Sequence, residues 1–195
     1  MRVRDSRPTA NRPRGQAGEE TAHQFVGEPL RAEEADLLAN ACRSPEEKLI
    51  VWTLLDTGLR VSELCALTLD NVQWQQRALR VAGKGGPHGT RSKPRVVPLS
   101  PRVRAILEPY FALNDRWFVG ARQAQKIVKR VANRAKMTRE VTPHVLRHTW
   151  ATLALQKGSS LAAVQKILGH DRLTTTAIYL NLTDGHVLDE FEAKW

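Results

Sequence analysis

The sequence predicts a mainly α-helical protein with one small antiparallel β-sheet, an α+β fold. Apolar residues recur at the three- and four-residue spacing of helices through most of the chain after Leu30. Between residues 72 and 99 the pattern changes to short runs typical of strands. The chain has 195 residues, 42% of them hydrophobic, which is enough for one sizeable core.

The first structured elements are predicted helices. Acidic and apolar residues alternate at helical spacing over residues 31–42. Ser44 and Pro45 form an N-cap and a first helical residue, and the apolar run behind them predicts a second helix. Gly58 ends that helix, and another helix is predicted over residues 61–67. The region before residue 29 is rich in glycine, proline and arginine, so it is expected to be a flexible basic tail.

Strands and further helices follow. Residues 72–76, 78–82 and 95–99 read as three short strands, the last two joined by a long, basic, glycine-rich loop. A basic helix at 120–136 carries its apolar residues on one face. The other predicted helices cover residues 101–113, 143–156, 161–168, 174–182 and 185–195.

The charge points to a polyanionic partner. Thirty lysine and arginine residues stand against 20 acidic ones, a net charge of +10. The surplus lies mainly in residues 58–136, with sixteen basic and four acidic residues. Nucleic acid or an acidic membrane surface fits this surplus, and solvated helix faces are the plainer explanation. No apolar run is long enough for a membrane span, and Cys42 and Cys65 lie in apolar surroundings, so we expect a cytoplasmic protein with reduced thiols.

Two segments suit phosphate chemistry. Arg60 lies at the start of a predicted helix, where backbone amides favour an anion, and Glu63 shares its helical face. Lys84 lies in the glycine-rich loop, where the backbone can approach a phosphate closely. Taken singly, the Arg60–Glu63 motif is as typical of a surface ion pair as of a phosphate site, and the Lys84 segment alone is more typical of a basic turn.

Two further segments contain histidines. His144 and Arg147, three residues apart, share a helical face suited to a phosphate at which a proton moves. His144 and His148 have the spacing of a helical metal pair, but no acidic residue or third ligand accompanies them, so no metal is expected and His148 is interpreted as structural. His170 alone fits a helix cap, and Tyr179 alone fits a core aromatic.

Taken together and in this order, Arg60, Lys84, His144-x-x-Arg147, Leu168-Gly169-His170 and Tyr179 resemble the tyrosine recombinase (phage integrase) family. The resemblance covers roughly residues 31–195, with Xer proteins and the short fimbrial invertases as the nearest types. It implies the catalytic-domain fold of that family over residues 29–195.

The resemblance also implies a mechanism. Tyr179 attacks a phosphodiester of double-stranded DNA, forming a 3′-phosphotyrosyl link and releasing a 5′-hydroxyl. Arg60, supported by Glu63, and Arg147 hold the non-bridging oxygens. The remaining roles fall to Lys84 as general acid, His144 in proton transfer at the tyrosine, and His170 as a hydrogen-bond donor to the phosphate. No metal, nucleotide or other cofactor is implied.

DNA contacts are expected along the basic middle of the chain, which removes the membrane-surface alternative. Residues 86–92 look inserted relative to the family hairpin, which leaves the register of Lys84 open. The residues expected to contact DNA are Arg91, Lys93, Arg95, Lys126, Lys129 and Arg130.

The organisation around the domain is also an expectation. The 28 residues of the tail are too few for the N-terminal core-binding domain of most members, so we expect that domain to be absent, in either a fragment or a short recombinase. The apolar stripe of the last helix suggests a homo-oligomer, a tetrameric synapse on DNA, while packing within one chain is equally consistent. The favoured function is a site-specific DNA recombinase of a prokaryote, phage or plasmid, nucleoid-associated in the cytoplasm. A type IB topoisomerase-like enzyme and a non-catalytic DNA-binding relative are the alternatives.

Overall fold

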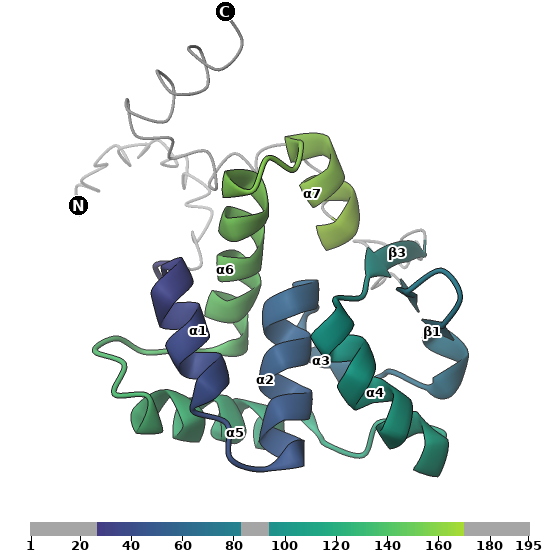
Figure 1. Ribbon diagram of the computed structural model, residues 1–195, viewed down its shortest axis with the longest axis horizontal. Coiled ribbons are helices and arrows are strands. Elements are labelled where there is room, and N and C mark those ends of the chain that lie inside the picture. Colours follow the sequence, from purple (N-terminus) through teal and green to yellow (C-terminus); the bar gives the residue numbers. More distant parts are fainter. Residues whose placement is uncertain (1–26, 83–93, 170–195) are drawn as a thin grey trace, which may run out of the picture.

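The computed structural model describes residues 27–82 and 94–169 and shows seven α-helices, a 3₁₀ turn and three strands within them. Figure 1 shows α2 running through the middle of the molecule, with α1, α4 and α5 around it. The elements are α1 (Ala32–Asn40), α2 (Pro45–Thr57), α3 (Val61–Leu64), the 3₁₀ turn η1 (Leu69–Asn71), β1 (Val72–Gln73), β2 (Ala78–Val81), β3 (Arg95–Pro98), α4 (Pro101–Leu113), α5 (Ala121–Arg134), α6 (Pro143–Gln156) and α7 (Leu161–Leu168).

The predicted helix starts are confirmed by their caps. In α2, α4 and α6 a serine or threonine side chain accepts a hydrogen bond from the backbone N–H three residues later, and proline follows at the first helical position. Each arrangement satisfies one of the amides that an α-helix leaves unpaired at its start. The capping residues are Ser44, Ser100 and Thr142, and Ser160 caps α7 in the same way.

The three strands form an antiparallel sheet in the order β1-β2-β3. Val81 lies opposite Arg95 and Leu79 opposite Val97, and all four residues are buried. The strands are shorter than the sequence predicted, since β1 ends at Gln73 and β3 at Pro98. The inward-facing residues of β3 therefore lie at positions 95 and 97, and the first of them is charged.

The main core is built around α2. Its Ile50, Val51 and Leu54 are fully buried, and α2 packs against α4, α5 and α6. On α5, Ile127 and Val128 face this core, as predicted, while basic residues occupy the opposite face. None of the helices within residues 27–82 and 94–169 combines the length and apolar character needed to cross a membrane.

Helix α7 touches this core at one residue, the partly buried Ile167. A separate small cluster of Ala151, Val164 and Leu168 joins it to α6, with Trp150 partly buried beside them. Figure 1 shows α7 next to the end of α6 and near β3. Among the described residues, α7 is therefore held by this cluster, by Ile167 and by polar contacts at its end.

Both cysteines are free thiols, Cys42 buried and Cys65 partly buried. Burial is the main cause that raises the pKa of the Cys42 thiol to about 11, and burial also raises the pKa of Cys65. A protonated thiol is unreactive, so both side chains act as small apolar groups.

Candidate active site

Gly58 makes the turn that leads into the candidate site. It ends α2 in the left-handed region at φ 62°, and a Cβ at this position would lie 2.7 Å from the Trp150 ring. Glycine is therefore required both by backbone conformation and by close packing. The turn places Arg60 at the N-cap of α3, as the sequence predicted.

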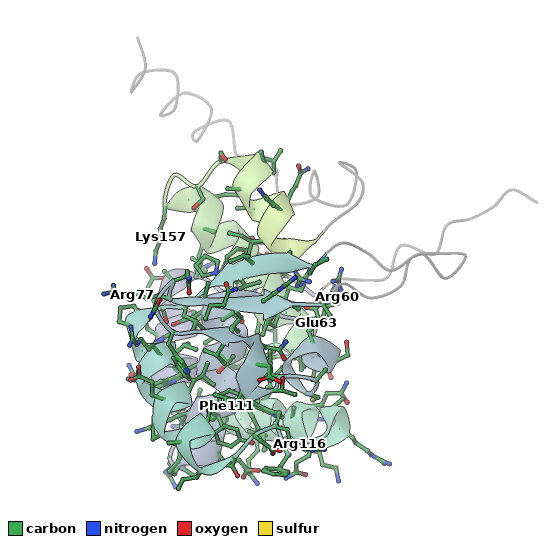
Figure 2. The ribbon with its side chains drawn as sticks, turned by 90° about the vertical axis from the view of Figure 1, so that its right-hand side faces the viewer. Arg60, Glu63, Arg77, Phe111, Arg116 and Lys157 are labelled. Atoms are coloured by element: carbon green, nitrogen blue, oxygen red, sulfur yellow. The ribbon has the colours of Figure 1, made fainter. Side chains whose placement is uncertain are left out.

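Arg60 and Glu63 form the expected pair. The Arg60 guanidinium donates to Glu63 Oε1 at 2.9 Å, and the backbone N–H of Arg60 donates to Oε2 at 2.8 Å. Figure 2 shows the two side chains close together beside the sheet. The Arg60 side chain is 36% exposed and that of Glu63 only 6%, so the arginine faces solvent over a buried carboxylate.

Glu63 also binds a second arginine, Arg95. Arg95, expected to contact DNA, is buried and forms a bidentate ion pair with Glu63, with N–O distances of 3.0 and 2.7 Å. Its Nε donates to the carbonyl oxygen of Ile167 in α7. The expectation of a surface contact for Arg95 is corrected, because position 95 faces inward on β3 together with Val97.

These arginines stabilise the charged form of the carboxylate. Burial alone would raise the pKa of Glu63, but hydrogen bonds from Arg95 and from the Arg60 backbone outweigh it and hold the pKa below its ordinary value. Glu63 is therefore ionised at neutral pH and stays a fixed negative charge between cations.

Arg147 joins the same cluster from α6. It is 2% exposed, and its two Nη atoms donate to the carbonyl oxygens of Gly58 and Leu168 at 2.6 Å each. Its Nη1 lies 3.9 Å from Glu63 Oε2. The ends of α2 and α7 are thus joined by one guanidinium beside the carboxylate that holds Arg60.

His144, one turn before Arg147 on α6, is exposed. Partial burial of the ring and the positive charges of Arg147 and Arg60 hold the pKa of His144 below its ordinary value of 6.5. The imidazole is therefore neutral at pH 7 and can accept a proton. His148 is buried, in keeping with its structural interpretation, and no group of three or more His, Cys, Asp or Glu side chains within the described segments is arranged to hold a metal ion.

The basic residues of α5 divide into two sets. Lys126 and Lys129 are exposed and line a groove of about 370 Å³ that also includes Thr142 at the start of α6. Arg130 instead pairs with the buried Glu47, 3.2 Å away, although 54% of its side chain stays exposed. The groove is the part of α5 best suited to an anionic partner.

Five predicted site residues lie outside the described residues: Lys84, Arg91, Lys93, His170 and Tyr179. Arg60, Glu63, His144 and Arg147, by contrast, are all described and gather in one place. The pairing of Arg95 with Glu63 was not predicted, although a signal for its inward position existed: the two-residue period of a strand places Arg95 on the same face as the apolar Val97.

Known proteins resemble this chain in sequence and in fold. The phage integrase family matches residues 28–186. Tyrosine recombinase XerC of Corynebacterium efficiens is 36% identical over 94% of this chain and 59% of its own length. The crystal structure of XerA recombinase is similar at a TM-score of 0.71, with 31% identity over 85% of this chain and 64% of that one. The pre-cleavage complex of XerH recombinase with difH substrate has the same fold, with a TM-score of 0.66, 23% identity and coverage of 85% of this chain and 54% of that one.

Proposed function

The chain belongs to the phage integrase family of tyrosine recombinases, and on this premise we propose that it is a site-specific DNA recombinase whose catalytic domain is formed by residues 29–195. The fold is that of the tyrosine recombinase catalytic domain. The chain spans less than two thirds of the length of the XerC relative, so its activity, DNA substrate and assembly are part of this proposal.

One observation carries the proposal. Arg60 and Arg147, 87 residues apart in the chain, meet at the ionised Glu63, and both lower the pKa of His144. Two permanent cations beside a neutral imidazole suit a reaction in which negative charge develops on phosphate oxygens while a proton leaves the nucleophile.

In the proposed cleavage step, one bond to phosphorus forms as another breaks. The Tyr179 oxygen forms a bond to phosphorus as the bond from phosphorus to the 5′-oxygen breaks. The phenol proton passes toward the neutral His144, and Lys84 gives a proton to the leaving oxygen. Arg60 and Arg147 stabilise charge on the non-bridging oxygens, with His170 as a further donor. Energy stored in the phosphotyrosyl link supports religation, so neither ATP nor a metal ion is expected to be required.

The test is a nicked suicide duplex drawn from the DNA that flanks the coding region, incubated in EDTA without ATP. We expect a covalent protein–DNA adduct on a denaturing gel, and we expect Tyr179→Phe to abolish it. An adduct that persists in Tyr179→Phe would overturn the proposal. Plasmid relaxation without exchange between two sites would instead indicate a topoisomerase-like activity, and DNA binding without an adduct would indicate a non-catalytic relative.

The DNA partner is proposed on the α5 groove as well as on the active site. The exposed Lys126 and Lys129 line that groove, and one structure of the same fold is of a recombinase bound to its DNA substrate. We further propose that copies of the chain assemble on DNA as a tetramer. Sedimentation of the protein with two duplex sites tests this assembly, which is contradicted if only one protein copy binds each site and the sites stay separate.

A further inference from the structure

Arg95 connects three parts of the molecule that carry the candidate active site. It lies at the start of β3, pairs with Glu63 of α3 through both carboxylate oxygens, and donates to the Ile167 carbonyl in the last turn of α7. We infer that Arg95 is a positioning residue: it fixes Glu63, and through Glu63 it sets where Arg60 presents its guanidinium to a phosphate. This inference rests on the proposed recombinase function.

The contacts of Glu63 show how Arg95 exerts this effect. Each oxygen of the carboxylate accepts one hydrogen bond from Arg95 and one from Arg60, which uses its guanidinium at Oε1 and its backbone N–H at Oε2. A bidentate arginine–carboxylate pair fixes the plane of the carboxylate. Glu63 therefore offers Arg60 one orientation only, and removal of Arg95 frees the carboxylate to rotate.

Arg60 and Arg95 differ in exposure and in how their guanidinium groups are used, and together these differences separate their roles. Nε and both Nη atoms of Arg95 donate to Ile167 and Glu63, whereas Arg60 donates to Glu63 through Nη1 of its guanidinium. The Arg60 side chain is 36% exposed, whereas the Arg95 side chain is 7% exposed. A DNA phosphate reaches Arg95 only if its pair with Glu63 breaks, which would leave a buried carboxylate with fewer partners. Arg60 is therefore the group that faces the substrate, and Arg95 supports it from inside.

Arg95 also lies against the end of α7. A Cβ added to Gly169 would be 3.0 Å from Arg95 Cδ and 3.2 Å from its Nε, and Gly169 has a φ of 66°. The last carbonyls of a helix lack partners within the helix and favour cations. Arg95 binds the carbonyl of Ile167, and Arg147 binds that of Leu168. The same two arginines that surround Glu63 thus hold the end of α7.

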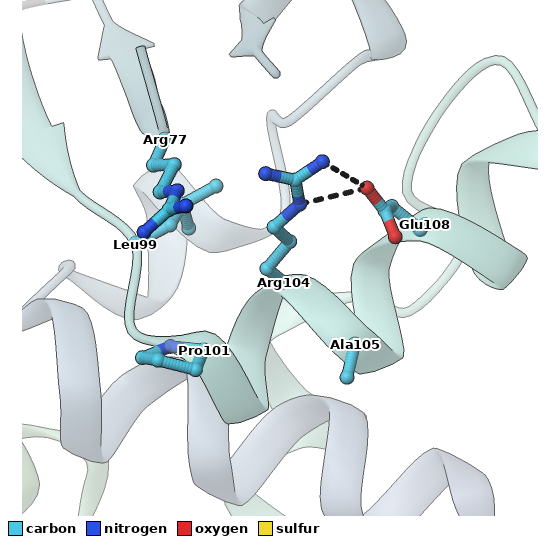
Figure 3. Close-up of a pocket in the computed structure, with 6 residues that line it drawn as sticks. All are labelled: Arg77, Leu99, Pro101, Arg104, Ala105 and Glu108. Atoms are coloured by element: carbon cyan, nitrogen blue, oxygen red, sulfur yellow. Dashed lines mark hydrogen bonds and ion pairs between the residues drawn. The ribbon is translucent and has the colours of Figure 1, made fainter. Parts of the chain in front are cut away.

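The test compares Arg95→Met and Arg95→Lys with a matched surface variant, Arg104→Met. Arg104 pairs with Glu108 on the exposed face of α4, at the pocket shown in Figure 3, outside the Glu63 cluster. Three quantities are measured for each folded variant: the single-turnover rate of adduct formation, the dissociation constant for duplex DNA, and the salt dependence of that constant. Glu63→Gln and the double variant Glu63→Gln/Arg95→Met complete a double-mutant cycle.

A positioning role predicts a rate effect without a binding effect. Arg95→Met is expected to slow adduct formation about 100-fold, as a displaced catalytic group does, while DNA affinity and its salt dependence stay at the wild-type values. Arg95→Lys keeps the charge but not the bidentate geometry, and its rate of adduct formation is expected to fall about 10-fold. Arg104→Met is expected to behave as wild type. Because Arg95 acts through Glu63, the double variant should be about as slow as Glu63→Gln alone.

Three results would overturn the inference. Weaker DNA binding with a salt slope reduced by about one would make Arg95 a phosphate contact. Rate losses that multiply in the double variant would show that Arg95 does not act through Glu63. If Arg95→Met forms the adduct at the wild-type rate, Arg95 has no positioning role. If Arg95→Met alone is unstable, the double variant keeps the test valid, since it leaves no unpaired buried carboxylate.

A last measurement separates this inference from the proposed function. If the wild-type protein forms no adduct on any duplex, the proposed function fails. The inference is then judged by NMR of the Arg60 Nε–Hε group and the Glu63 carboxyl carbon. Arg95→Met is expected to shift both signals and to raise the pKa of Glu63, which faces Arg60, Arg95 and Arg147. If both signals are unchanged in Arg95→Met, the inference that Arg95 positions Glu63 and Arg60 is wrong.

Discussion

His144 differs from its neighbours in the site because its charge changes near neutral pH, while the arginines keep theirs. Its pKa is lowered by partial burial and by Arg147 and Arg60, so the ring is neutral under physiological conditions. The cations that are proposed to bind the phosphate thus also keep the proton acceptor in its active form.

The rate of adduct formation should therefore depend on His144 protonation. As the pH falls through the lowered pKa, on the acid side of 6.5, the imidazole gains a proton and the wild-type rate is expected to drop. His144→Asn should be slower by about 100-fold and should lack this titration. Single-turnover rates between about pH 8 and about pH 5 provide the measurement. DNA affinity over the same range is the control, and a flat wild-type profile would contradict the prediction.

Among the contacts between single residues, the sequence predicted those between neighbours in the chain but not those between distant positions. The Arg60–Glu63 pair follows from helical spacing, which brings residues three apart together. The contact between Arg95 and Glu63 joins positions 32 residues apart, and no local period predicts which distant partner a buried charge finds. The inward direction of Arg95 was predictable from strand alternation, but its basic side chain suggested a surface.

At the scale of elements, the site depends on how helices end. Gly58 terminates α2, and its carbonyl receives Arg147; Gly169 terminates α7, and Arg95 lies against it. Both glycines have positive φ angles. Helix ends leave carbonyl groups without partners, and here the arginines of the candidate site satisfy them.

Substitution of Gly58 should therefore affect both stability and activity. Gly58→Ala places a Cβ 2.7 Å from Trp150 at a φ of 62°, so we expect a loss of about 2 kcal/mol or more in unfolding free energy, together with slower adduct formation. Gly120→Ala is the matched control, since its Cβ would meet nothing within 4 Å. Urea denaturation of both variants tests this, and equal stabilities would contradict it.

Glu47 joins α2 to α5 through Arg134 and Arg130. The hydrogen bonds from Arg134 are the main cause that lowers the pKa of Glu47 to about 2. Glu47→Gln is expected to cost about 2 kcal/mol of unfolding free energy at pH 7. The lowered pKa means that this contribution is present above about pH 4.5 and is lost as the pH falls toward about 2.

The measurement is the difference in unfolding free energy between wild type and Glu47→Gln at pH 7 and at about pH 3. Glu46→Gln is the control, because Glu46 is exposed one residue earlier in the same helix turn. The prediction is wrong if the difference is the same at both pH values or if the two variants are equally stable.

Elements were predicted better than contacts because their signals are local. The caps Ser44-Pro45, Ser100-Pro101 and Thr142-Pro143 marked three helix starts that the structure confirms. The strand ends were less well predicted, because pairing with a neighbouring strand decides where a strand stops, and the sequence shows only which residues favour one.

At the scale of the whole molecule, the proposed substrate is a polyanion and the net charge is +10. In the structure, these basic residues fall into two groups. Arg95, Arg130 and Arg134 form ion pairs with the buried carboxylates Glu63 and Glu47, whereas Lys126 and Lys129 line an exposed groove. If the chain binds DNA as proposed, the exposed lysines and the partly exposed Arg60 are the charges placed to release counterions, whereas Arg95, Arg130 and Arg134 already have carboxylate partners.

The salt dependence of DNA binding should follow this division. Lys126→Ala/Lys129→Ala is expected to reduce the slope of log K against log salt by about two. Lys157→Ala should leave the slope unchanged, because Lys157 lies at the opposite side of the molecule from Arg60 in Figure 2. Fluorescence anisotropy over a range of salt concentrations measures both. A slope unaffected by the double substitution would remove the α5 groove from the DNA interface.

The way in which α7 is attached affects how the folded protein opens locally. Among the described residues, its apolar attachment consists of the small cluster around Leu168 and of Ile167, while its last carbonyls are held by Arg95 and Arg147. Detachment of α7 uncovers this cluster and the part of the main core that Ile167 covers, while the rest of the core stays packed. We therefore expect its amides to exchange with deuterium through a partial opening of lower free energy than global unfolding. Each such opening also breaks the carbonyl contacts of both arginines. We therefore expect the candidate site to come apart and re-form in the folded protein more often than the chain unfolds.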